Sequence, residues 1–308
     1  NGQIPALVME KVGQSLTDTL DILARNAFLA HPYPTYAGTA TSRTGLGAND
    51  LFDINIAELV RTHLEEAECP GVASNTDGGG QAVIAIVTSR VAHDIRTASG
   101  SEWIDAQNYV GTNRRFTSEI GQWGGVRFLK TNRLRLDNCG QVLAQTTLSA
   151  ATVPGQGAAS TVDTVYSPGQ PGSTRYVTVE SVSGFAVGQK VTIHKGTSGN
   201  PPVESDGTQE TRRIVSIDTT NKRLSFDKPL LKDHDAGDLV THGRDVHATI
   251  FIGGPTVVWA IAERPTMIFP PKMDDAMMVN RVGWRGLFKF QLFRPEWHRV
   301  HYSAGSTN

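Results

Sequence analysis

The sequence lacks most features of a secreted, metal-binding or membrane protein. Among 308 residues there are only two cysteines, Cys69 and Cys139. They provide neither a disulfide framework nor a Cys-x-x-Cys zinc pattern. No apolar run approaches the roughly 18 residues of a membrane helix, and no basic-then-apolar signal peptide precedes the first predicted helix. We therefore expect a chain made in a reducing cytoplasm, without a membrane span.

An excess of charge of one sign is also missing. Lys and Arg number 29 against 30 Asp and Glu, which gives a net charge of -1. This balance argues against tight, salt-sensitive binding of a polyanion. Hydrophobic residues make up 39% and charged residues 19% of the chain, as in soluble globular proteins. The length suffices for one large domain or two ordinary ones.

The histidines do not form a recognisable reactive group. His298 and His301 are three residues apart and would make a metal-ligating pair on a helix, but their neighbours favour a strand, which points them to opposite faces. His93-Asp94 and His234-Asp235 are adjacent pairs whose side chains are expected to diverge, and no nucleophile elbow lies near either. We therefore expect no metal site.

Other candidates for chemistry also have simpler interpretations. The glycines at 78–80 precede a strand and are not followed by Gly-Lys-Ser/Thr, which argues against a phosphate loop. Asp274 and Asp275 are typical of the first turn of a helix. Glu119, beside glycines, is expected to accept backbone or arginine hydrogen bonds rather than to transfer protons. The sequence thus predicts neither an enzyme nor a cofactor site.

The most informative stretch runs from Ala82 to Leu136. Ala82–Val87 is an unbroken apolar run, which predicts a central strand buried on both faces. A helix is expected next, capped by Ser89 and interrupted at Ser99-Gly100. Thr117–Thr131 then contains three glycines that permit a tight elbow, from which a strand begins at Val126.

In these residues the sequence resembles the major capsid proteins of tailed bacteriophages, which have the Hong Kong 97-type fold. Four pieces carry the resemblance in order: Val83–Val87, Val91–Arg96, Trp103–Tyr109, and an elbow made of Glu119, Ile120, Gly121, Gly124, Gly125, Val126, Arg127 and Phe128. Many such proteins contain a similar Glu-Ile-Gly-x-x-Gly-Val-Arg-Phe phrase, and the extra glycine here is a departure from it. A glycine elbow between a helix and a strand is also common in any α/β or α+β domain, and that alternative stays open.

Two helices are predicted before this stretch. From Ile4 to about Ala30, apolar residues recur with a period near three and a half, at Leu7, Val8, Val12, Leu16, Leu20, Leu23, Ala27 and Phe28. His31-Pro32 ends this helix. The resemblance implies that it is the spine helix of the capsid fold, although a helix packed on any sheet would look the same. Because the chain starts at Asn1, the resemblance also implies that an N-terminal arm and an extended loop are cleaved, disordered or missing.

The second helix is expected to be capped by Asn49 or Asp50 and to stop at Cys69-Pro70-Gly71. Its predicted buried stripe consists of Leu51, Ile54, Leu59, Val60 and Leu64.

Beyond Leu136 the composition changes. Ser149–Arg175 is rich in small residues and proline and is predicted to be a linker. Five short alternating runs follow, at 176–179, 190–193, 213–217, 223–226 and 238–240, and they indicate a small barrel or sandwich. We therefore predict an inserted β domain at 152–244 between two parts of a core, 1–151 and 245–308, with the two ends of the insertion close together.

The last part of the chain is expected to complete the core sheet. His247–Gly254 is predicted to return as a strand and Pro255–Ala262 to form a short helix. Val279–Val282, Gly286–Phe293 and Trp297–Tyr302 are predicted to close the sheet. Aromatic and basic residues alternate here, which resembles a nucleic-acid platform, but alternation in strands favours a core face and a solvated or intersubunit face.

The sequence thus predicts an α+β protein, and the resemblance implies a structural major capsid protein. Such a protein assembles as hexamers and pentamers into an icosahedral head shell in the virion, and encloses double-stranded DNA without reading its sequence. Scaffold, portal and cement or decoration proteins are its implied partners. We expect the isolated chain to assemble or be insoluble rather than stay a monodisperse monomer. Two alternatives remain: a decoration or carbohydrate- or host-binding β module, and an enzyme with a split α/β core.

Overall fold

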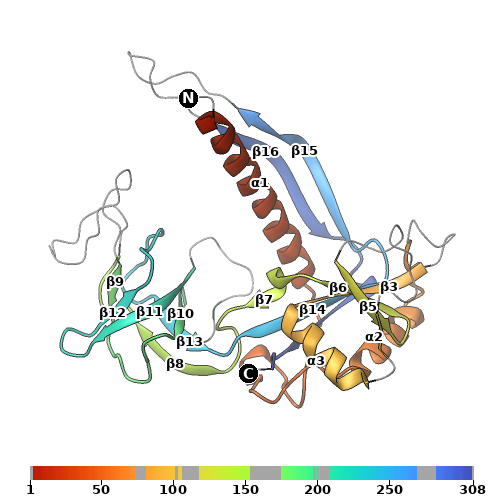
Figure 1. Cartoon of the computed structure of the whole chain (residues 1–308), viewed down its shortest axis with the longest axis horizontal. Helices are drawn as coiled ribbons and strands as arrows, with labels where there is room; N and C mark the ends of the chain where they lie inside the picture. Colours follow the sequence, from red (N-terminus) through yellow and green to blue (C-terminus); the bar gives the residue numbers. More distant parts are fainter. Residues whose placement is uncertain are drawn as a thin grey trace.

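The computed structural model describes residues 3–73, 81–100, 103–105, 118–152, 175–196, 199, 201, 209–268 and 282–306. Their fold mixes a few helices with several sheets (Figure 1). A nine-stranded sheet forms the centre, a six-stranded sheet lies to one side, and a long helix stands beside a two-stranded hairpin. Within these ranges, no helix has both the length and the apolar character needed to cross a membrane.

The nine-stranded sheet has β3 in its interior. The order is β1-β17-β14-β3-β6-β5-β4, with β2 paired to β3 and β7 to β14. β3 runs parallel to β6 and antiparallel to β14, so the predicted central strand is confirmed, as is the return of the chain as β14. The strands are β1 Thr35–Tyr36, β2 Val72–Ala73, β3 Gln81–Val87, β4 Ile104–Asp105, β5 Glu119–Trp123, β6 Val126–Lys130, β7 Arg135–Leu136, β14 Val246–Ile252 and β17 His298–Ser303.

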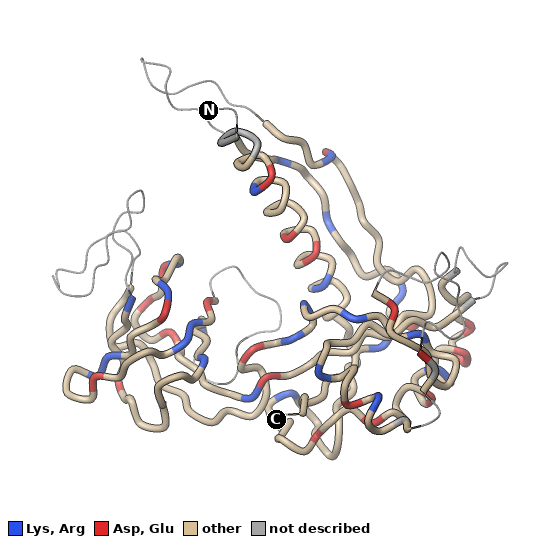
Figure 2. Tube along the Cα trace, in the orientation of Figure 1, with Lys and Arg blue, Asp and Glu red and all other residues tan. Residues whose placement is uncertain are grey.

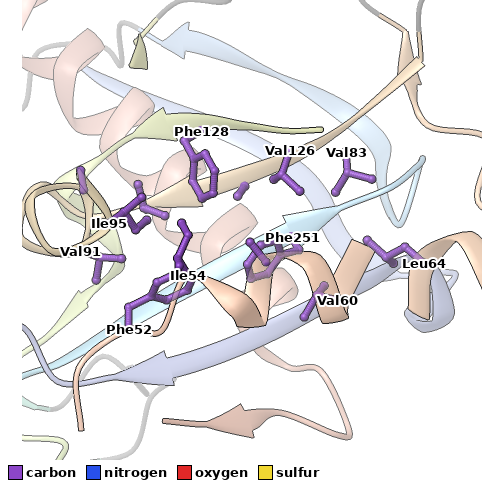
Figure 3. Packing of buried hydrophobic residues seen from close by; sticks show 14 residues of the cluster. Phe52, Ile54, Val60, Leu64, Val83, Val91, Ile95, Val126, Phe128 and Phe251 are labelled. Atoms are coloured by element: carbon purple, nitrogen blue, oxygen red, sulfur yellow. The ribbon is translucent and has the colours of Figure 1, made fainter. Parts of the chain in front are cut away.

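Both faces of this sheet are covered. On one face, helices α2 (Asn55–Glu66) and α3 (Ser89–Ser99) enclose a cluster that includes Val60, Ile95, Phe128 and Phe251 (Figure 3). On the other face, the buried cluster consists of Leu29, Ala37, Leu46, Leu134, Leu136, Cys139, Val246, Ala248, Ile250, Val300 and Tyr302. β3 contributes to both, because Ala85 belongs to the first cluster and Ile86 packs against the second.

The helix starts differ from the predictions. Thr88, not Ser89, is the N-cap of α3, and its Oγ1 accepts the Val91 N–H at 3.5 Å. α2 begins at Asn55 rather than after Asn49 or Asp50, because the Asp50 carboxylate instead accepts the N–H of Gly47 at 2.8 Å.

The predicted stripe of α2 is only partly buried. Val60 and Leu64 are buried, whereas Leu59 is 52% exposed. Leu51 lies before the helix and bridges Ala304.

The long helix and its neighbouring hairpin form a unit that we call the extension. Helix α1 (Gln3–Leu29) has 27 residues, as the sequence predicted, which corresponds to about 40 Å. β15 (Val257–Ile268) and β16 (Gly283–Leu292) pair only with each other in the described chain, from Val257 opposite Leu292 to Ile268 opposite Gly283. β16 was therefore correctly predicted as a strand but does not close the large sheet.

The predicted helix at Pro255–Ala262 is wrong. From Val257 onward, these residues belong to β15, where β-branched Val257, Val258 and Ile261 pair with β16. The predicted strand Val279–Val282 lies, apart from its last residue, outside the described residues. Trp297–Tyr302 corresponds to β17, which joins the large sheet between β1 and β14.

The six-stranded sheet, here called the β module, has its own core. Its order is β8-β13-β10-β11-β12-β9, and its buried residues, among them Val191, Ile214 and Leu224, form a separate cluster. All five predicted strands are confirmed, and the sixth, β8, precedes the predicted boundary at Thr152. The strands are β8 Val142–Thr147, β9 Tyr176–Thr178, β10 Lys190–His194, β11 Glu210–Asp218, β12 Arg223–Phe226 and β13 Leu239–Gly243. Most of the predicted linker, 153–174, lies outside the described residues.

Short 3-10 helices complete the described elements. They are η1 Arg43–Gly45, η3 Asn132–Leu134 and η4 Pro295–Trp297.

Candidate assembly surface

The motif at 119–128 is a β-hairpin rather than an elbow leading from a helix. Glu119–Trp123 is itself a strand, β5, and pairs antiparallel with β6 from Trp123 opposite Val126 onward. Gly124 and Gly125, with φ of 56° and 78°, make the connecting turn. Two successive residues with positive φ are typical of the tight turns that match the twist of paired strands. The predicted start of a strand at Val126 is confirmed.

A helix of the same body holds this turn. Arg61 of α2 donates from Nη1 to the carbonyl of Gly124 at 2.7 Å and is itself held by Glu65 at 2.7 Å. A Cβ at Gly125 would lie 2.3 Å from the same Arg61 nitrogen. The positive φ therefore favours glycine at 125, and a Cβ there would also displace the Arg61 guanidinium that holds the turn.

The remaining motif residues anchor the hairpin in the core. Val126 and Phe128 are fully buried (Figure 3), and Glu119 is only 8% exposed. Ile120 is half-buried and packs against the same cluster. Gly121 pairs with Phe128 next to a register shift, and Arg127 is half-buried. The motif thus forms the two strands next to β4 at the edge of the large sheet.

Only the C-terminal end of α1 is held firmly to the body of the molecule. Leu29 is buried, and the Phe28 carbonyl accepts a hydrogen bond from Nε2 of His298 at 3.2 Å. Arg133 forms an ion pair with Asp21 at 3.3 Å and also contacts Asp18. α1 also lies beside β16 (Figure 1). The helix and this strand line a groove with Ala27, Phe288 and Leu292 on its walls.

The rest of the extension leaves large apolar side chains in solvent. On α1 these are Leu7, Val8, Met9, Ile22 and Leu23, which are 38–55% exposed. On the hairpin they are Val258, Trp259, Ile261, Met267 and Leu287, which are 39–64% exposed. The predicted one-faced stripe of α1 is therefore real in the sequence but only half-covered in the single chain. Exposed apolar side chains in this number make the extension the candidate surface for contact with another molecule.

Alternation along β16 agrees with the prediction only in part, because Leu287 in β16 and Phe293 just after it are each 64% exposed. Trp284, Phe288, Phe290 and Leu292 are half-buried, while Arg285 and Lys289 point outward. Trp259 of β15 stacks on Phe290 at 5.6 Å between ring centroids. Charged side chains are few along the hairpin (Figure 2), and Arg285 is paired with Glu263 at 2.9 Å. This composition favours packing against protein over a nucleic-acid platform.

His298 and His301 lie on opposite faces of β17, as the strand pattern predicted. His298 faces the end of α1, with its ring 4.6 Å from that of His31. His301 contacts the Phe52 ring at 5.5 Å and forms a hydrogen bond with Thr35 at 2.9 Å. Burial is the main reason that the pKa of each of these two strand histidines falls to about 4. Both are therefore neutral packing residues at neutral pH.

The adjacent His-Asp pairs differ from each other. His234 and Asp235 diverge as predicted: His234 lies 3.5 Å from Glu210 and 3.7 Å from Asp238, while Asp235 pairs with Lys195. Burial alone would raise the pKa of Glu210, but hydrogen bonds from His234 and the Leu231 N–H outweigh it and lower that pKa.

The divergence predicted for His93 and Asp94 is wrong. Their Nδ1 and Oδ1 atoms are 3.5 Å apart, because the buried Asp94 sits below an exposed ring. Asp94 also accepts the Ser306 N–H at 3.1 Å, so it ties down the end of the described chain.

The other sequence candidates cannot be placed. The glycines at 78–80, the pair Asp274 and Asp275, and most of Trp103–Tyr109 lie outside the described residues. Trp103 itself is described, and its Nε1 donates to Asp105 at 2.9 Å. The described residues contain no group of three or more His, Cys, Asp or Glu side chains arranged to hold a metal ion.

Similarity to known proteins is found among solved structures. No family model matches the sequence, and no curated protein matches it. Among solved structures, the chain is similar to the capsid of Ralstonia phage GP4, with 11% sequence identity and a TM-score of 0.44. The match covers 90% of this chain and 53% of that capsid chain. This chain therefore spans about half the length of its structural neighbour.

Sequence reasoning missed the hairpin as a separate unit. β15 carries exposed apolar residues without strict alternation, so its pattern did not predict a strand. The available signal was the density of β-branched and aromatic residues in Val257–Ile261.

Proposed function

We propose that this chain is a major capsid protein with the Hong Kong 97-type fold, and that its copies tile an icosahedral phage head around double-stranded DNA. In this proposal α1 is the spine helix and the β5–β6 hairpin is the family motif at 119–128. The β module is a domain inserted into the core. Hexamers and pentamers are the assembly units, and scaffold, portal and cement proteins are candidate partners in the virion.

The extension is the observation that carries the proposal. One long helix and one long hairpin project from the body and leave apolar side chains uncovered along their length (Figure 1). A two-stranded hairpin alone is marginally stable in water, so the extension has reason to gain stability from neighbouring copies. Heterologous contacts that repeat around a closed ring would cover such a surface in every copy.

The resemblance at 119–128 supports the same proposal from different residues. The motif sets a tight turn between two strands and buries Val126 and Phe128 in the core. A structural role is thus the simplest use of Glu119, Gly124 and Phe128 in the arrangement described.

The test is electron microscopy of the full-length protein expressed alone and in its native particle. Regular shells or capsomers are expected. Discrete small oligomers that are absent from the particle's shell would refute the major-shell role and favour a decoration or host-binding component.

A matched pair of variants makes the test specific to the extension. Leu287→Glu places a charge where a leucine is 64% exposed on β16, and Val187→Glu does the same at a 62% exposed valine of the β module. We expect Leu287→Glu to abolish assembly and Val187→Glu to leave it intact. Normal shells from Leu287→Glu would contradict the proposed role of the extension.

A further inference from the structure

A cavity of about 280 Å³ lies where the β module joins the large sheet. Its charged and histidine wall residues are Arg90 at the start of α3, Lys190 and His242 from the β module, Arg244 and Asp245 from the connection between the two sheets, and His247 from β14. Pockets for drug-sized ligands usually span about 300–1,000 Å³, so this cavity is suited to a smaller group.

Hydrogen bonds of the backbone fix the connection that forms one wall of the cavity. The Gly140 N–H donates to the Arg244 carbonyl at 2.8 Å, and the Gly243 N–H donates to Oδ1 of Asn138 at 3.1 Å. A Cβ at Gly243 would lie 2.9 Å from the Asn138 carbonyl oxygen, so glycine permits the two segments to lie side by side. The backbone that carries Arg244 is therefore fixed against the segment 138–141.

The cavity carries an excess of positive charge. Asp245 is paired with Arg135, and Lys190 with Asp137 at 3.3 Å. By contrast, Arg244 donates to the neutral amide of Gln141 at 3.4 Å, and Arg90 to the carbonyl of Ser306. Within the described ranges, neither of these two guanidinium groups has a carboxylate partner. Each retains donors for an anion, since a guanidinium has five N–H groups.

His247 adds a buried donor on the same wall. Thr88 Oγ1 and Nδ1 of His247 form a hydrogen bond at 2.8 Å, and the same Oγ1 accepts the Val91 N–H. Burial, and then Arg135, lower the pKa of His247 to about 4, so the ring is neutral at neutral pH. In the tautomer in which the Thr88 hydroxyl donates to Nδ1, the ring carries its proton on Nε2. His247 is 3% exposed, and Nε2 has no hydrogen-bond partner in the described part of the chain.

Glycine is required beside this donor. A Cβ at Gly305 would lie 2.6 Å from Nε2 of His247. Gly305 also lines the cavity, so it leaves the edge of the imidazole uncovered there.

We propose that this cavity binds a phosphate group. Arg90 and Arg244 would contact its oxygens from two sides, and Nε2 of His247 would donate a hydrogen bond from the buried wall. Charge-assisted hydrogen bonds from guanidinium groups are the strongest contacts a protein offers to such an oxyanion. The group is either free inorganic phosphate or a phosphate of a nucleotide chain. The inference stands independently of the proposed function, since it uses none of the extension.

The first experiment is a titration of the full chain, in whatever assembly state it is purified, with inorganic phosphate followed by phosphorus NMR. Ionic strength is held constant with sodium chloride. Saturable broadening of the phosphate signal is expected. Arg244→Gln should weaken binding about tenfold or more, the effect of losing one charge-assisted hydrogen bond.

Controls separate a site from general attraction. Arg213→Gln removes the same charge from an exposed position of the same β module and should leave binding unchanged. Arg90→Gln tests the opposite wall if Arg244→Gln fails to fold, and it should also weaken binding. Absence of saturation with any phosphate compound, or equal weakening by Arg213→Gln, would overturn the proposal.

A second titration identifies the source of the phosphate. A short single-stranded oligonucleotide, with and without a 5′-phosphate, competes with inorganic phosphate. Competition that requires the 5′-phosphate indicates a terminal phosphate, competition by both indicates a backbone phosphate, and competition by neither indicates the free ion.

Discussion

Acid is expected to destabilise this protein through histidines buried in β17. His298 and His301 are both fully buried, and burial lowers the pKa of each to about 4. The same side chains in an unfolded chain would have a pKa near 6.5. His298 faces His31, whose pKa is also lowered mainly by burial, and Arg299, which disfavours a second positive charge beside it.

The sign and size of the effect follow from proton linkage. Between about pH 4 and pH 6.5 the unfolded state binds more protons than the folded state, so stability rises with pH in that window. The contribution is fully present above the unfolded pKa and is lost as the pH falls toward 4. A histidine with a pKa of about 4 in the folded state and 6.5 in the unfolded state therefore lowers the free energy of unfolding by about 2 kcal/mol when the pH falls from 7 to 5.

His298→Gln isolates one of these contributions. A glutamine amide can still donate to the Phe28 carbonyl but does not titrate. Urea unfolding at pH 7 and pH 5 should show that the variant loses about 2 kcal/mol less than the parent between these two pH values. Any constant cost of lost ring packing cancels in this difference.

An exposed histidine provides the control. The His93 side chain is 69% exposed, and His93→Gln should change the stability difference between pH 7 and pH 5 less than His298→Gln does. If His298→Gln lost as much stability on acidification as the parent does, the reasoning from burial would be refuted.

Three further predictions concern the motif and the β module. Gly125→Ala should reduce the free energy of unfolding by about 1–3 kcal/mol. The reduction should exceed that of Gly124→Ala, because only a Cβ at residue 125 would also meet Arg61. Equal effects of the two variants in urea unfolding would exclude a role for that contact. Phe128→Ala should cost about 3–5 kcal/mol, the range for a fully buried aromatic ring, and a change below 1 kcal/mol would show that the ring is not packed as described. Glu210→Gln should destabilise the β module by about 1–3 kcal/mol, because the carboxylate accepts the Leu231 N–H at 2.9 Å and lies 3.2 Å from Arg212. Unchanged amide hydrogen exchange in β11 would contradict this loss of stability.

Residue patterns predicted the secondary structure correctly where a pattern is compatible with only one environment in the fold. The apolar run Ala82–Val87 predicted a strand buried on both faces, and β3 lies in the interior of the large sheet. Alternation predicted the strand that begins at Tyr176, where only Val177 is buried, and it also located the strand that begins at Lys190, although Val191–His194 are buried without alternation. His31-Pro32 correctly marked the end of α1, since proline cannot continue a helix.

Elements whose form depends on distant partners were not predicted. β15 follows a proline and looked like a helix start, yet it is a strand because β16 lies alongside it after a long intervening segment. β8 carries Gln145, Thr146 and Thr147, a polar end that local propensity does not assign, and it pairs with β13 almost a full module later. The cavity beside Arg90 and Arg244 was also unpredictable, because no short sequence pattern contains both residues.

The extension contains one strand that its residue pattern predicted, β16, and one that it did not, β15. In β16, alternation gives one face to α1, with Phe288 and Phe290 half-buried there. In β15, Trp259 and Ile261 remain more than 40% exposed, although both are large apolar residues of types that are usually well buried. A long edge strand with such side chains invites pairing with another chain, and Pro265 together with two register shifts limits that pairing along the strand. The hairpin therefore leaves apolar side chains uncovered in the single chain, and in the proposed shell the same residues that obscured its prediction are the ones a neighbouring copy would cover.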